Sequence, residues 1–226
     1  MDSRLLNYRE FVTLEKKTLS ILRNNLCKRR SLSHIATDAD KCLFSDNQCS
    51  FAFSTYWDVV YMDEDCRIFI GALVEKIPKQ NKILYMSYYV CIVEGIEPPN
   101  KILRKFHFDY VSEGTKSEVP HPRFHLQYCG ELPPGMTEQG MKDKHIEPLL
   151  PKVKQPRILF MPFTIALLMN TLFYEFPTED IEHVREEPAW RNRVHENEKQ
   201  ILVPFYEQCV RLARKENTIL FDNAYV

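Results

Sequence analysis

The sequence predicts an α+β fold in which an antiparallel sheet is covered on one face by helices. Both ends of the chain carry apolar residues at helical spacing, whereas residues 50–128 are rich in β-branched and aromatic residues. The connections between successive strands in this region are short, which favours a meander of antiparallel neighbours. We therefore expect about five strands within a single domain that spans residues 1–226.

The first element, residues 1–30, is expected to be a helix. Asp2 or Ser3 can cap its start, and apolar residues recur along it at helical spacing. Glu15 interrupts this apolar stripe, so the face that packs on the sheet is imperfect. The basic run at 28–30 suits the negative end of the helix dipole, and a nucleic-acid patch is the other interpretation.

Residues 50–128 contain alternating or continuous apolar runs, and turn-forming stretches separate these runs. We expect each run to be a strand. Stretches such as MDEDC and PKQNK mark the turns. The five runs are SFAFSTYWDVVY, RIFIGALVEKI, ILYMSYYVCIVEG, KILRKFHFDYV and HPRFHLQ.

The last part of the chain is predicted to hold a long loop and then helices. Residues 129–160 are rich in proline and glycine and too long for a routine connection, which indicates a binding loop or a lid. The region 161–217 is expected to be helical, and its first helix, within FTIALLMNTLFYEF, is apolar enough to be buried. Pro188 interrupts the next helix, and Pro204 is a candidate kink in the final one.

Composition and motifs exclude several classes of function. The 30 Lys and Arg residues against 31 Asp and Glu residues give a net charge of −1, which indicates no overall attraction to nucleic acid or membrane. The start has no signal-peptide pattern, and the longest apolar run is too short to cross a bilayer. The 7 cysteines form no CxxC pair, so we expect free thiols in a cytoplasmic protein. No nucleotide-binding or nucleophile motif is present, and no cofactor is predicted.

Polar residues alternate with apolar ones on the last two strands. Since side chains of a strand alternate between faces, the polar sets of both strands are expected on one face, away from the helices and exposed to solvent. A symmetric hairpin loop would place these polar residues opposite one another in pairs. The predicted cross-strand pairs are Asp109–Arg123, His107–His125 and Lys105–Gln127.

Three interpretations of this polar face stay open. It is a solvated surface with incidental histidines, a binding surface, or a catalytic site for metal-free phosphodiester cleavage. In the catalytic case, facing histidines serve as base and acid while a cation holds the phosphate. The candidate catalytic residues are His107, His125, Arg123 and Asp109. The candidate binding residues are Lys105, Arg123, His121, Gln127 and Arg157.

A metal site is not predicted on this face. His121 and His125 could supply nitrogen ligands together with His107, and Asp109 could supply a carboxylate. Residues four apart on a strand are separated by about 13 Å, however, so His121 and His125 cannot share one ion without a bend.

Four short motifs resemble a family of bacterial proteins of unknown function. They are FHFDY, HPRFHLQ, PRI and NTLFY, and they span about the central third of the chain. The family pattern has His-Pro-x-x-His-Leu-His and Arg-Ile-Pro, whereas this chain has Gln127 as the last residue of the first motif and its proline displaced to Pro162. If that last histidine is catalytic in the family, its loss argues against enzymatic activity here. The resemblance implies a toxin or antiphage gene context by association.

Together these features favour a non-catalytic accessory subunit of a bacterial multi-protein complex, in an antiphage defence setting. Its expected partners are other protein subunits, such as an ATPase or nuclease encoded nearby. The absence of a complete catalytic motif, the long loop and the apolar tail TILFDNAYV support this hypothesis. The alternative is a toxin-like, metal-independent endoribonuclease that uses His107, His125 and Arg123.

Overall fold

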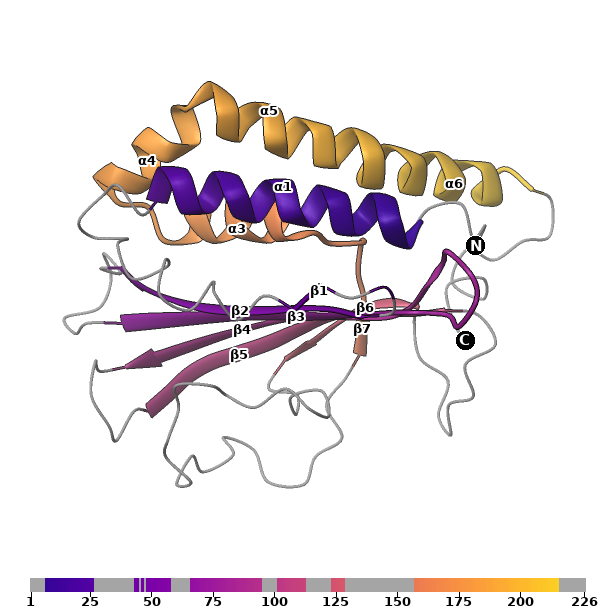
Figure 1. Ribbon diagram of the computed structural model, residues 1–226, viewed down its shortest axis with the longest axis horizontal. Coiled ribbons are helices and arrows are strands. Elements are labelled where there is room, and N and C mark those ends of the chain that lie inside the picture. Colours follow the sequence, from indigo (N-terminus) through magenta and orange to yellow (C-terminus); the bar gives the residue numbers. More distant parts are fainter. Residues whose placement is uncertain are drawn as a thin grey trace.

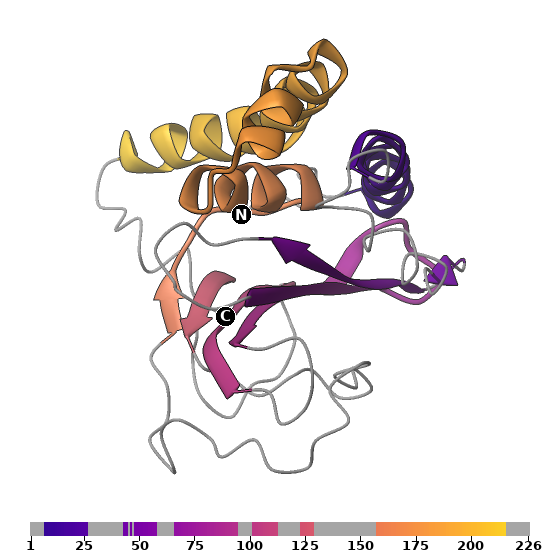
Figure 2. The ribbon, with the colours of Figure 1, turned by 90° about the vertical axis from the view of Figure 1, so that its left-hand side faces the viewer.

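The computed structural model shows a sheet beneath two layers of helices (Figure 1). The structure describes residues 7–26, 43–44, 46, 48–57, 66–94, 101–112, 123–128 and 157–215. The helices all lie on one side of the sheet in both ribbon views (Figure 2). This arrangement confirms the predicted α+β class with helices on one face.

The sheet is an antiparallel meander in which every strand pairs with its neighbour in sequence. The meander was predicted, but the described residues form seven strands rather than about five, because short strands extend both edges of the sheet. They are too short to show an alternating pattern, and the last of them lies in the region predicted as a loop. The strands are β1 (Leu43–Phe44), β2 (Gln48–Trp57), β3 (Cys66–Lys76), β4 (Ile83–Glu94), β5 (Lys101–Val111), β6 (Phe124–Tyr128) and β7 (Arg157–Leu159).

The helices form an inner layer on the sheet and an outer layer above it. The inner layer consists of α1 (Tyr8–Leu26) and α3 (Ile165–Glu175), and Figure 2 shows both directly above the strands. Within the described residues, no helix is long and apolar enough to cross a membrane. The outer layer consists of α4 (Glu179–Glu186), α5 (Pro188–Asn197), the π-helical segment η4 (Glu198–Leu202) and α6 (Val203–Ala213).

The outer helices run on from one another, and prolines mark where they change. Pro188 occupies the first turn of α5, where a missing N–H costs nothing. The predicted kink at Pro204 is instead a π turn just before it, in which Val203 N–H donates to Glu198 O five residues back. Because Pro204 has no N–H to continue the α-helical ladder, this wider turn accommodates it.

The start of α1 is fixed to the turn between β3 and β4. Asn7 caps the helix, since its Oδ1 accepts from Glu10 N at 3.2 Å. The same Oδ1 accepts from Asn81 Nδ2 in the turn at 2.8 Å, and Asn81 Oδ1 accepts from Arg9 N at 3.2 Å. The cap thus joins helix to sheet; the caps predicted at residues 2 and 3 lie outside the described residues.

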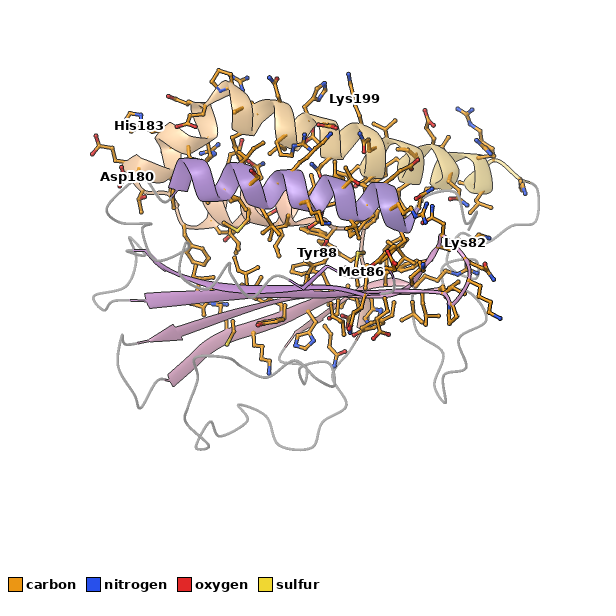
Figure 3. The ribbon with its side chains drawn as sticks, viewed as in Figure 1. Lys82, Met86, Tyr88, Asp180, His183 and Lys199 are labelled. Carbon is orange, nitrogen blue, oxygen red and sulfur yellow. The ribbon has the colours of Figure 1, made fainter. Side chains whose placement is uncertain are left out.

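The main core lies between the sheet and the inner helices. Figure 3 shows Met86 and Tyr88 pointing from β4 toward the helices, and both are buried. As predicted, α3 is buried around most of its circumference, because the sheet lies below it and the outer helices lie above. Its buried residues are Ile165, Ala166, Leu167, Leu168, Met169, Leu172 and Phe173.

Glu15 is a buried carboxyl within this apolar layer. The residue that interrupts the apolar stripe of α1 is 0 % exposed, and its Oε2 and Oε1 accept from Ile165 N at 3.2 and 3.4 Å. Burial raises the pKa of Glu15 to about 8, although this backbone hydrogen bond, the Tyr88 side chain and the charge of Arg193 all lower it. The polar residue in the apolar face of α1 therefore makes a polar contact with the first turn of α3.

We expect Leu168→Ala to lower the free energy of unfolding by about 2–5 kcal/mol, because it leaves a cavity in a packed interior. The exposed Glu175 at the end of the same helix offers a control. Glu175→Ala should change the value by less than about 0.5 kcal/mol. Urea titrations of both variants test the ranking, and equal losses would show that α3 is not buried as described.

Glu15→Gln should remove a pH dependence of stability. Between pH 4.5 and 8 the unfolded chain has lost the Glu15 proton that the folded chain keeps, so stability falls as pH rises in that window. From pH 6.5 to 8 this effect amounts to about 2 kcal/mol in the wild type. Urea titrations at both pH values should show this extra loss in the wild type and not in Glu15→Gln. Parallel losses in the two proteins would contradict a raised pKa.

Candidate functional site

The polar residues of β5 and β6 share one face, as predicted, but with a different register. The strands pair with a shift of two residues, which keeps every side chain on its expected face. The aromatic residues on the opposite face account for the shift, because the Phe124 ring lies 4.7 Å from that of Tyr110 and 5.6 Å from that of Phe205 on α6. The prediction of Asp109–Arg123, His107–His125 and Lys105–Gln127 pairs is therefore wrong. The observed pairs are Asp109–His125 and His107–Gln127.

The shift brings a carboxylate and an imidazole together. Asp109 Oδ2 lies 3.5 Å from His125 Nε2, and His107 occupies the diagonal position beside them. Ser87 on β4 lies opposite Asp109 on its other side, and Arg123 precedes β6. We call these five residues the sheet polar cluster.

The sheet polar cluster is buried, which corrects the expectation of a solvent-exposed face. His107 is 2 % exposed and His125 is 3 % exposed, and Ser87 and Arg123 are buried as well. The prediction failed because it used only the polar residues of β5 and β6. The continuous apolar run of β4 is typical of a strand buried on both faces, and this signal could have indicated the outcome.

Neighbouring residues of β3 and β4 cover the same face with apolar surface. The buried Tyr89 ring lies so close to Gly71 that a Cβ on this glycine would be 2.1 Å from the ring. Only glycine fits beneath the ring. Leu73 and Cys91 on this face are buried too. The polar cluster is therefore part of a second interior surface on the side of the sheet away from the helices.

Burial sets the charge of the cluster. It lowers the pKa of His107 to about 4, an effect that Lys105 and His125 reinforce and that the charge of Asp109 opposes. His107 is thus neutral near pH 7. Burial also raises the pKa of the Tyr85 phenol on β4, and the charge of Asp109 adds to this shift.

This geometry limits the chemistry of the cluster. A neutral His107 can accept a proton, and its buried Nε2 has no hydrogen-bond partner in the described part of the chain. Ser87, Asp109 and His125 form a row with the carboxylate in the middle, so the serine hydroxyl faces a carboxylate and not an imidazole. The row therefore lacks the hydroxyl–imidazole contact that activates a serine nucleophile.

The other predicted site residues are spread over the edge of this face. Lys105 lies opposite Cys91, and Gln127 lies between His107 and the backbone of Arg157 on β7. His121 lies outside the described residues. Across the described ranges, no three His, Cys, Asp or Glu side chains are placed to share a metal ion. The cluster therefore joins four of the predicted residues, together with Ser87, which the sequence analysis missed.

The outer helix α6 carries three of the exposed large apolar side chains. Val203, Tyr206 and Val210 are 47, 51 and 48 % exposed, and their spacing places them on one face of the helix. We call these three residues the α6 stripe. Figure 1 shows α6 in the outer part of the helical layer, where its buried Phe205 reaches Phe124 on β6. Large apolar side chains aligned on an outer helix are typical of an interaction surface.

A groove of about 700 Å³ opens between the end of α3, α4 and α5. Tyr174 lies in it with 63 % of its surface exposed, and the Arg185 guanidinium carbon lies 3.6 Å from the centre of its ring. Arg185 Nη1 also contacts Glu182 Oε1 at 2.6 Å. An aromatic ring stacked by an arginine is a frequent centre of protein–protein contacts.

Comparison with known proteins gives no match: no family model, no curated protein and no solved structure is similar to this chain. The resemblance to a bacterial family through short motifs therefore stays a prediction.

We expect His107→Asn to remove a contribution to acid sensitivity. Since the folded pKa is about 4 and the usual value 6.5, the unfolded chain binds a proton first as pH falls through this window, and stability is lost. The loss amounts to about 3 kcal/mol at most. Thermal unfolding at pH 7 and pH 4.5 tests this, with the exposed His195→Asn as control. If His107→Asn lost as much stability as the wild type on acidification, His107 would not be buried and neutral.

Proposed function

We propose that this chain is a non-catalytic accessory subunit that binds other proteins through its outer helical layer. The α6 stripe is the observation that carries the proposal. Three apolar side chains, each about half exposed, lie on one face of α6. An amphipathic helix that presents such a face commonly packs against an apolar surface of a partner.

The state of the sheet polar cluster also supports a non-catalytic role. Its histidines are 2 and 3 % exposed, whereas an enzyme that cleaves a polymer must bring the scissile bond within hydrogen-bond reach of its acid and base. The cluster lies in the interior, where its Asp109–His125 contact helps to specify a single packing arrangement of the strands.

The setting of the proposal rests on the motif resemblance. It implies a bacterial multi-protein complex and an antiphage defence context, with an ATPase or nuclease encoded nearby as partner. The cytoplasmic location is proposed from the cysteine pattern instead. The exposed aromatic and arginine pair in the outer groove, Tyr174 and Arg185, offers a second contact for such a partner.

Co-purification with the products of neighbouring genes tests the proposal. The double variant Val203→Ser/Val210→Ser should weaken the complex at least about tenfold, because it removes apolar area from the centre of the interface. The control is Glu179→Gln, an exposed position at the start of α4 and not on α6. Circular dichroism should show both variants folded. Undiminished binding by the double variant would contradict the proposed surface.

A second candidate, the metal-independent endoribonuclease, is favoured by one observation. The contact between Asp109 and His125, next to a neutral His107 with an unpartnered Nε2, resembles an acid–base pair. We expect the purified chain not to cleave RNA. Cleavage that His125→Ala abolishes, and that the exposed-site control His195→Ala retains, would favour the ribonuclease instead.

A further inference from the structure

A second buried polar cluster joins the inner and outer helical layers. It consists of Glu15 on α1, Tyr88 on β4, and Arg193, Glu196 and Asn197 on α5. We call it the interhelical polar cluster. Four of its residues are more than nine-tenths buried, and only Glu196 is half-buried. Buried charges and amides cost stability unless they are paired, so their pairing decides how the layers pack.

Glu15 has a partner that suits a neutral carboxyl. Both of its oxygens lie within 3.4 Å of Ile165 N, the first N–H of α3. The neighbouring cap, Thr164 Oγ1, accepts separately from Leu167 N at 3.3 Å. Glu15 therefore accepts one weak backbone hydrogen bond, from Ile165 N. It does so at a helix N-terminus, where the helix dipole favours a negative charge.

Arg193 has donors to spare. Its Nη2 contacts Glu196 Oε2, and its backbone oxygen accepts from Asn197 Nδ2 at 2.7 Å. Its buried Nε and Nη1 have no hydrogen-bond partner in the described part of the chain. An unsatisfied buried donor is costly. A nearby acceptor that pairs with these two donors of the guanidinium would therefore stabilise the protein.

We propose that Glu15 and Arg193 form a pH-sensitive switch, in which the ionised Glu15 carboxylate recruits the unused donors of Arg193 and changes how α5 packs on α1. The step releases one proton from Glu15 to solvent, and Arg193 keeps its Nη2 contact with Glu196 while its Nε and Nη1 pair with the Glu15 carboxylate. Hydrogen bonds between two charged groups are about twice as strong as neutral ones, which favours the new pair once the proton has left.

The groups that face Glu15 set the pH at which this happens. Tyr88 approaches from β4 and Arg193 from α5, and α3 contributes its N–H but no acidic side chain in its first turn. Burial outweighs the favourable groups and keeps Glu15 protonated up to a pKa of about 8. The switch therefore operates on the alkaline side of neutrality.

The switch acts on the helix that leads to the proposed binding surface. Arg193 lies on α5, which continues through η4 into α6 and the α6 stripe. Movement of α5 thus regulates the stripe; this consequence, unlike the switch itself, rests on the proposed function.

Trp190 reports the switch directly. It lies on α5, is fully buried, and its Nε1 donates to Asn170 Oδ1 on α3 at 3.3 Å. In a Trp57→Phe background it is the single tryptophan. Its fluorescence, followed from about pH 6 to about pH 9.5, should change in one transition with a midpoint near 8.

Variants in the Trp57→Phe background separate a switch from a merely structural role. Glu15→Gln should abolish the transition, while Glu10→Gln, an exposed position on α1, should keep it. Glu196→Gln should move the midpoint to lower pH, because the positive charge of Arg193 is then no longer shared with a second carboxylate. Absence of the transition, its persistence in Glu15→Gln, or an unmoved midpoint in Glu196→Gln would overturn the switch. The measurement needs no partner, so its failure is distinguishable from failure of the proposed function, which the α6 stripe variants test.

Discussion

The packing of the helical layers depends on one contact, between the carboxyl of Glu15 and the first N–H of α3. Glu15 has no exposed surface, and Ile165 N lies 3.2 Å from its Oε2. An apolar residue at this position would leave the helix start without that acceptor, and an unpaired charge there would be costly. The contact ties α1 to α3 within the shared apolar core, and the charge of Arg193 on α5 acts on the same carboxyl.

The far side of the sheet follows the same principle with different residues. There Ser87, Asp109 and His125 form a row beside buried apolar neighbours such as Tyr89. Burial keeps His107 neutral. Both faces of the sheet are thus interior surfaces, and each holds a polar cluster within apolar packing. Exposed apolar side chains are instead found on the outer helix α6 and at Tyr174 in the groove beside α4 and α5. The buried polar clusters that help to specify the fold are therefore separate from the exposed side chains that are available to a partner.

The sequence predicted the meander and the buried helix α3 because both follow from local patterns, short turns and apolar periodicity. It also predicted which residues of β5 and β6 share a face, since alternation is a property of a single strand. The register could not be predicted, because it depends on the contact of Phe124 with Tyr110 and with Phe205, which is distant in sequence. The role of Glu15 could not be predicted either, because its partner Ile165 lies 150 residues further along the chain. In the sequence alone, Glu15 only interrupts the apolar stripe of a helix.

The central claim is that Glu15 stays protonated in the interior near neutral pH and thereby holds the helical layers together. Titration of the glutamate side-chain carboxyl carbons by NMR measures this directly, with Glu15→Gln identifying the resonance. The account predicts that the Glu15 resonance titrates with a pKa of about 8, well above the usual 4.5. A Glu15 resonance that titrates near 4.5 would contradict it.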